Sequence, residues 1–168
     1  MADPRWLDDE EQTAWRAYIE SSRRVMDLLE RDLQVSSGLP VTYYEVLVQL
    51  SEAPGRMMRM SELARRSLSS PSRLSHAVAR MEALGWVRRE SCPTDRRGAF
   101  AVLTDEGFTV IEAAAPGHVE SIRTHFLDHL SRDQIRQIRE IGEAVSGHLQ
   151  EERDAACDGA EAAGGCDG

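Results

Sequence analysis

The stretch of sequence that decides the fold is residues 60–107, MSELARRSLSSPSRLSHAVARMEALGWVRRESCPTDRRGAFAVLTDEG. Apolar residues at helical spacing predict a short helix over 62–67 and a longer helix over 71–84. Ser70 is a typical N-cap for the longer helix, because its hydroxyl can accept a hydrogen bond from a free backbone N–H. Gly85 is a typical residue just past a helix end. The stretch therefore predicts two consecutive helices separated by a short turn.

A β-hairpin is predicted directly after the longer helix. Residues 86–92 and 99–103 are expected to be strands, and a short extended segment at 57–60 precedes the two helices. The connecting residues 93–98, PTDRRG, combine turn formers with two arginines. Two helices followed by a basic hairpin are the element order of a winged helix-turn-helix. In such a domain the second helix enters the DNA major groove, and an arginine on the hairpin reaches the neighbouring minor groove.

The longer helix has two chemically distinct faces. One face is apolar and is expected to pack on the domain; it comprises Leu74, Ala77, Val78, Met81 and Leu84. The opposite face combines hydroxyls, cations and small residues with almost no acid; it comprises Ser72, Arg73, Ser75, His76, Ala79 and Arg80. An ordinary exposed helix mixes and pairs its charges, so this face favours contacts with phosphates and base edges. For His76 the alternative is an incidental surface histidine.

The charge of the chain is unevenly distributed. The formal net charge is −9, yet residues 56–97 contain ten arginines against four acidic residues, a local charge of +6 that leaves −15 for the rest. All 20 residues counted as lysine or arginine are arginine, so each offers planar, bidentate donors. A basic segment on an acidic body favours a nucleic-acid face. A solvated basic face without a partner is the alternative.

Further helices are predicted on both sides of this region. The N-terminal one covers 8–36, where an aspartate and a glutamate three residues later form a capping box. Another covers 104–130, with a break or kink expected at Pro116 because proline lacks the N–H that a helix interior needs. The last one opens with a second capping box and covers 131–153.

The composition excludes several functional classes. Hydrophobic residues make up 41% of the chain, enough for a packed core, but no apolar run is long enough to span a bilayer. The N-terminus is acidic and lacks a basic-then-apolar start, so a cytoplasmic location without a membrane partner is expected. The three cysteines fit neither a disulfide framework nor a metal site, and no nucleophile–base set or phosphate loop is present. We therefore expect neither an enzyme nor a bound metal or cofactor.

These motifs resemble the MarR (multiple antibiotic resistance regulator) family of winged helix-turn-helix transcriptional regulators. The matching segments are MSELA at 60–64, SPSRLS at 70–75 and MEALGWV at 81–87. The most specific part is DRRG at 95–98 followed by LTDEG at 103–107, which looks like the family's wing motif, D-x-R followed by L-T-x-x-G. The resemblance extends over about residues 10–150. It implies a mainly α fold with a small β-hairpin wing and long N- and C-terminal dimerisation helices.

The resemblance implies roles for individual residues in binding double-stranded DNA. Arg97 would enter the minor groove, and Asp95 would hold Arg97 through a charge-assisted hydrogen bond. The residues that would face the major groove or its phosphates are Ser70, Ser72, Arg73, Ser75 and His76. Further candidates for phosphate contacts are Arg80, Arg88, Arg89 and Arg96. The residues with expected structural roles are Leu103, Thr104 and Gly107, the last because it would let the following helix pack closely. Alternatives are a plain solvated turn at 95–97, and strand-edge charges that discourage aggregation at 88–89.

A homodimer is expected from the outer helices and from the resemblance. Their apolar stripes exceed what a central domain of about 80 residues could cover, and such leftover surface usually lies in an oligomer interface. The residues expected there are Leu7, Trp15, Leu130, Ile135, Ile138, Ile141, Val145 and Leu149. The expected organisation is a dimerisation helix at 1–38, a DNA-binding domain at 39–107, dimerisation helices at 108–153 and a disordered acidic tail at 154–168. An intrachain helical bundle is the alternative.

The resemblance also implies a repressor that binds a palindromic operator and is released by a small aromatic or anionic ligand. Candidate pocket residues are Trp15, Tyr18, Tyr43, Tyr44 and Phe108, for which an ordinary core role is the alternative. Cys92 lies near wing arginines, which can lower the pKa of a thiol, so a redox role stays open. The remaining alternatives are a winged-helix module for protein contacts, a regulator without a ligand, and an activator.

Overall fold

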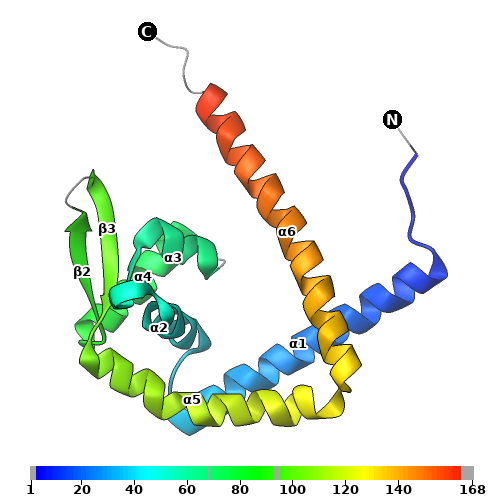
Figure 1. Ribbon diagram of the computed structural model, residues 1–168, viewed down its shortest axis with the longest axis horizontal. Coiled ribbons are helices and arrows are strands. Elements are labelled where there is room, and N and C mark those ends of the chain that lie inside the picture. Colours follow the sequence, from blue (N-terminus) through cyan, green and yellow to red (C-terminus); the bar gives the residue numbers. More distant parts are fainter. Residues whose placement is uncertain (1–2, 68, 93–94, 164–168) are drawn as a thin grey trace. The chain divides into compact units, whose positions relative to one another are not determined.

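The computed structural model describes residues 3–67, 69–92 and 95–163, with the backbone alone for 92, 95–97 and 150–163. The chain divides into two compact units, Met1–His125 and Phe126–Gly168. The helices of the first unit are α1 (Asp9–Ser37), α2 (Val41–Glu52), η1 (Pro54–Arg56), α3 (Met60–Arg66), α4 (Pro71–Ala83) and α5 (Asp105–His125). Its strands are β1 (Met57–Arg59), β2 (Val87–Cys92) and β3 (Asp95–Leu103). The second unit holds η2 (Leu127–His129) and α6 (Arg132–Ala163) (Figure 1). The predicted mainly α fold with a small hairpin wing is confirmed.

The sheet has three antiparallel strands in the order β1-β3-β2. β1, predicted only as an extended segment, pairs with the second edge of β3, where Met58 lies opposite Ala101. β3 begins at Asp95, so the expected turn at 93–98 is wrong over 95–98, which are strand backbone. The reason is that pairing between β2 and β3 continues as far as Cys92 and Asp95, with an irregular register after Ser91.

The hydrophobic core of the first unit lies among α2, α3, α4 and the sheet, which Figure 1 shows gathered together. Its largest fully buried side chains are Leu33, Val46, Leu47, Leu50, Leu63, Leu74, Val78, Met81 and Val87. Burial of one such side chain stabilises the fold by about 1.5–3 kcal/mol. The predicted apolar stripe of α4 is confirmed except for Leu84, which is 54% exposed. Leu84 is exposed because α4 ends at Ala83 and the chain turns at Gly85, where φ is +78°.

α1 packs against α5, and the contacts join the second half of α1, at Asp32 and Ser36, to the second half of α5, at Gly117, Ser121 and His125 (Figure 1). α5 runs as one helix through Pro116, so the expected break does not occur. Pro116 and Glu112, the residue whose carbonyl loses its N–H partner, are both exposed, so water can bind that carbonyl. The helix ends at His125 and does not continue to Leu130, since Phe126 leaves helical geometry at φ −138° and ψ −67°.

The last helix is longer than its sequence predicted. Its capping box is confirmed: the Ser131 hydroxyl accepts from the Gln134 N–H at 3.2 Å, and the Gln134 side chain accepts from the Ser131 N–H at 2.8 Å. The backbone of α6 then remains helical to Ala163, beyond the expected end at 153. The expected disordered tail is therefore corrected over 154–163, where alanine and glutamate are strong helix formers. The end of that tail, 164–168, lies outside the described residues. In the described part of the chain, no helix is both long and apolar enough to cross a bilayer.

Candidate nucleic-acid interface

The exposed face of α4 is the centre of the candidate site. The hydroxyl of Ser70 accepts from the Arg73 N–H at 3.3 Å, and a proline follows at the first helical position, so the helix start is fixed as predicted. Ser72, Arg73, His76 and Arg80 are exposed, and no acid lies in the first turn. Among the described residues, nothing forms a hydrogen bond or ion pair with the side chains of Arg73, His76 and Arg80. Three cationic or titratable groups are thus available to a partner on one helix face.

The preceding helix α3 contributes little negative charge despite its glutamate. The carboxylate of Glu62 lies 2.7 Å from the Arg65 guanidinium and 2.6 Å from that of Arg66. These hydrogen bonds, that of Arg65 first, lower the pKa of Glu62 to about 2. The carboxylate therefore stays ionised and paired, and α3 does not offset the positive charge of the exposed α4 face.

The end of β3 is fastened to the end of α4 by the LTDEG segment. The Thr104 hydroxyl donates to the Gly85 carbonyl at 2.7 Å and accepts from the Gly107 N–H at 3.0 Å. The Thr104 N–H donates to the Trp86 carbonyl at 3.0 Å. A Cβ on Gly107 would lie only 2.1 Å from that carbonyl oxygen. The expected close packing at Gly107 is confirmed, and this part of the motif sets where the wing begins relative to α4.

A second fastening of the wing, which the sequence did not indicate, comes from Arg89 on β2. Its guanidinium donates to the Ser75 carbonyl at 2.7 Å, and its backbone N–H donates to the Glu82 carboxylate at 3.0 Å. Arg88 instead pairs with Glu90 on the same strand at 2.6 Å. The sequence offered both arginines as phosphate contacts or edge charges. The partners of Arg89 lie seven and fourteen residues away, on another element, so no local pattern distinguished it.

A third contact ties η1 to the start of α5. Arg56 adopts φ +54°, and its guanidinium lies 3.8 Å from the centre of the Phe108 ring. The same guanidinium donates to the Asp105 carboxylate at 3.0 Å. Phe108, a predicted pocket residue, is thus partly buried against the core and covered by a cation.

The tip of the wing carries the most specific predicted DNA contacts. The backbone of Asp95, Arg96 and Arg97 belongs to β3. Their side chains, and that of Cys92, lie outside the described part of the structure. The insertion of Arg97 into a minor groove, its bond to Asp95 and a redox role for the cysteine all stay predictions.

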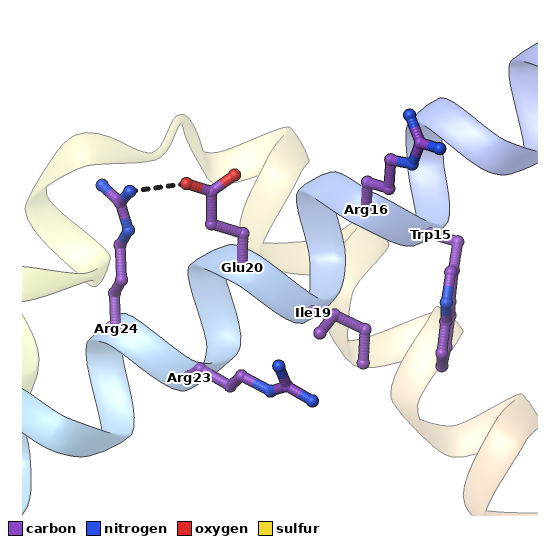
Figure 2. Close-up of a pocket in the computed structure, with 6 residues that line it drawn as sticks. All are labelled: Trp15, Arg16, Ile19, Glu20, Arg23 and Arg24. Atoms are coloured by element: carbon purple, nitrogen blue, oxygen red, sulfur yellow. Dashed lines mark hydrogen bonds and ion pairs between the residues drawn. The ribbon is translucent and has the colours of Figure 1, made fainter.

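The five predicted pocket residues divide between the exposed surface of α1 and the core of the first unit. Trp15 and Tyr18 are exposed neighbours on α1, with ring centres 6.1 Å apart. Figure 2 shows a pocket along α1 that includes Trp15 but none of the other four; its lining is Trp15, Arg16, Ile19, Glu20, Arg23 and Arg24. Tyr44 is buried in the core and Tyr43 packs against it. A core role therefore fits Tyr43 and Tyr44.

Tyr44 also contacts α5, where it meets a histidine that the sequence analysis did not single out. The rings of Tyr44 and His118 lie 4.4 Å apart, and burial lowers the pKa of His118 and raises that of Tyr44. The Nδ1 atom of His118 is buried and has no hydrogen-bond partner among the described residues. An imidazole whose buried Nδ1 has no partner among the described residues therefore lies between α2 and α5.

A polar cluster joins the end of α5 to α1. The Asp32 carboxylate accepts from the hydroxyl of buried Ser121 at 2.7 Å and lies 2.8 Å from Nε2 of His125. These hydrogen bonds, that of Ser121 first, lower the pKa of Asp32 below its ordinary value. The partners are 89 and 93 residues from Asp32, which explains why the sequence did not reveal the cluster.

The winged helix-turn-helix class is defined by a short helix, a second helix with a cationic outer face and a β-hairpin, in that order. In this chain the hairpin is hydrogen-bonded to the second helix and to the turn that follows it. A model of the MarR family matches residues 37–98. The transcriptional regulator HosA of Escherichia coli O111:H- is 35% identical over 91 residues, which are 54% of this chain and 65% of HosA. The match therefore spans slightly less than two thirds of that relative.

Two solved structures match over most of the chain. Sco3205, a MarR family transcriptional regulator from Streptomyces coelicolor crystallised with DNA, is 51% identical with a TM-score of 0.83, covering 87% of this chain and 92% of that one. AbsC, another MarR family regulator from Streptomyces coelicolor, is 46% identical with a TM-score of 0.82, covering 88% and 99%. This chain belongs to the MarR family of transcriptional regulators. The relatives named here are regulators and not enzymes.

Proposed function

We propose that this chain is a cytoplasmic, homodimeric repressor that binds a palindromic operator in double-stranded DNA. The observation that carries the proposal is the exposed α4 face, where Arg73, His76 and Arg80 have no partner among the described residues. Arginine and histidine on such a helix can donate to base edges and phosphates in the major groove. The DNA complex of Sco3205, which is 51% identical to this chain, supports the same use of the fold.

DNA binding is tested by the affinity for duplexes that the protein selects from genomic fragments, measured by fluorescence anisotropy at several salt concentrations. We expect Arg73→Ala to weaken binding by about tenfold or more, as for loss of a base or phosphate contact. Arg136→Ala removes the same charge from α6, where Arg136 pairs with Asp133, and is expected to change affinity less than twofold. Equal effects of the two substitutions, or binding that does not fall with salt, would favour a module for protein contacts.

The homodimer is supported by apolar side chains that each unit leaves exposed. On α6 the exposed fractions are 41% for Ile138, 62% for Ile141, 53% for Val145 and 51% for Leu149, all on one helical face. In the first unit, Leu7 is 53% and Trp15 is 55% exposed. Leu130 and Ile135 are partly buried. A two-fold dimer would present two α4 helices to half-sites about 34 Å apart, which matches a palindromic operator.

The dimer is tested by analytical ultracentrifugation. Ile141→Glu places a charge within the exposed stripe of α6, so we expect it to yield monomers and to weaken operator binding. Arg136→Glu lies on the side of the same helix opposite the stripe as a whole and is the control, since successive residues are about 100° apart around the axis. A dimer that survives Ile141→Glu would remove this stripe from the interface.

The proposal includes release from the operator by a small aromatic or anionic ligand. It is supported by His118, whose buried Nδ1 lacks a partner among the described residues, next to the ring of Tyr44. A ligand that hydrogen-bonds this atom relieves a desolvation penalty of about 1–3 kcal/mol. Such a ligand lowers the affinity for DNA only if it binds the DNA-free conformation more tightly than the DNA-bound conformation. Benzoate is a suitable first probe: operator release by benzoate should disappear in His118→Phe, and an unchanged response would exclude this site.

A further inference from the structure

We infer that Arg89 is a positioning residue that fixes the wing strand β2 on the reading helix α4, and that it does not bind a DNA phosphate. The inference rests on the proposed DNA-binding function. It identifies which of two adjacent arginines fixes the position of β2 relative to α4. Arg88 and Arg89 have the same side chain and occupy consecutive positions of one strand. Their surroundings differ, and the difference assigns their roles.

The contacts of Arg89 join β2 to α4 at two separate points. Its guanidinium donates to the carbonyl of Ser75 at 2.7 Å and approaches the Ser75 hydroxyl at 3.5 Å. Its backbone N–H donates to the Glu82 carboxylate at 3.0 Å, and its Nε lies 3.7 Å from the same group. Ser75 and Glu82 are two helical turns apart, which corresponds to roughly 10 Å along the helix axis. Two anchors at that spacing restrict both sliding and rotation of the strand along the helix.

The charge of Arg89 is already compensated within the protein. Its side chain is 33% exposed, and the Glu82 carboxylate beside it is 41% exposed. A phosphate bound at this guanidinium would approach that carboxylate and compete with the Ser75 carbonyl. Arg88 is 57% exposed, and its charge is paired with Glu90 at 2.6 Å on the same strand, without a contact to α4 among the described residues. Removal of Arg88 therefore takes away a cation without disturbing the junction between β2 and α4.

The position of Arg89 along the hairpin explains what it would do in DNA binding. The base of the hairpin is held by Thr104, which bonds the Gly85 and Trp86 carbonyls. Arg89 lies on β2 further from the base and attaches this strand to α4. The two attachments together prevent the hairpin from swinging about its base. α4 and the wing must enter adjacent grooves at the same time. A fixed angle between them therefore reduces the conformational entropy that is lost on binding DNA.

The test uses the full-length chain and the duplex that wild type selects. Arg89→Met and Arg88→Met each remove one cation and keep an unbranched side chain. We expect Arg89→Met to bind at least tenfold more weakly with an unchanged slope of log K against log salt, and Arg88→Met to stay within about threefold. Loss of a true phosphate contact would instead reduce that slope by about 0.9. A reduced slope in Arg89→Met therefore overturns the inference.

A third variant separates geometry from charge. Glu82→Ala removes a negative charge from α4 itself, so electrostatics alone predicts tighter DNA binding. The positioning role predicts weaker binding, by about threefold or more, because the anchor of Arg89 at Glu82 is lost, both the backbone hydrogen bond and the ion pair. Tighter binding by Glu82→Ala overturns the inference.

A measurement without DNA distinguishes failure of this inference from failure of the proposed function. Amide hydrogen exchange of β2 and β3 should accelerate in Arg89→Met and Glu82→Ala but not in Arg88→Met, while exchange in the α2 core stays slow. Slow α2 exchange also shows that the variants fold. Unchanged exchange in the hairpin refutes the positioning role whether or not DNA binds. Absence of duplex binding by wild type would refute the proposed function. The exchange rates of the hairpin would then still test the positioning role of Arg89.

Discussion

Replacement of Gly107 by alanine tests the packing on which the base of the wing depends. Gly107 lies in the first turn of α5, where a Cβ would come within 2.1 Å of the Trp86 carbonyl oxygen and 2.8 Å of a Leu103 methyl carbon. The oxygen belongs to the backbone, so rotation of a side chain cannot relieve the overlap. The Thr104 hydroxyl accepts from the Gly107 N–H and donates to the Gly85 carbonyl, so a shift of α5 would strain both hydrogen bonds.

The magnitude combines two opposing effects. Overpacking against rigid neighbours costs up to about 3 kcal/mol. Alanine is more favourable than glycine in a helix by about 1 kcal/mol, which offsets part of that cost. The expected net loss is therefore about 2 kcal/mol, a decrease in Tm of roughly 4–8 °C for a chain of this size.

Gly117 supplies a matched control in the same helix. The nearest atom that its added Cβ would meet is the Ser36 hydroxyl at 3.7 Å, an ordinary contact. Gly117→Ala should therefore gain helix propensity and become more stable, by up to about 1 kcal/mol. Urea unfolding followed by circular dichroism, at one fixed protein concentration, gives both free energies. A Gly107→Ala protein as stable as Gly117→Ala would refute the packing argument.

Four further outcomes are expected. Hydrogen bonds lower the pKa of Asp32, so its stabilising contribution is present above its ordinary pKa of 3.8 and is lost as the pH falls through the lowered value. Urea midpoints measured on acidification should therefore fall less steeply below pH 3.8 in Asp32→Asn than in wild type; parallel curves would contradict this. Ser70→Ala should lower the free energy of unfolding by about 1 kcal/mol and Ser70→Gly by only a few tenths, and equal losses would argue against a capping role. In gel-shift assays Arg97→Ala should weaken operator binding while the thermal unfolding curve stays unchanged; unaltered affinity would remove Arg97 from the DNA contacts. A chain that ends at Arg153 keeps the exposed apolar stripe of α6 and should sediment as a dimer, whereas a monomer would place part of the interface beyond that residue.

Features set by neighbouring residues were predictable from the sequence. The capping boxes of α1 and α6 and the Ser70 cap were found because a cap depends on side chains three residues apart. The two faces of α4 follow in the same way from the helical period, and the position of the wing follows from a motif of contiguous residues. These local rules indicated a winged helix-turn-helix before any packing was known.

Features that depend on the path of the chain were not predictable. The pairing of β1 with β3 needs a partner strand some forty residues away, and the Asp32–Ser121 bond spans 89 residues. Arg89 looks identical to Arg88 in the sequence, and only the approach of β2 to α4 gives it the Ser75 carbonyl. α5 continues through Pro116 because packing against α1 holds the helix while the freed carbonyl faces water. Local spacing thus determined which elements form and which face of α4 is polar. Tertiary packing decided how the wing is held and which charges stay available, because those depend on contacts between distant segments.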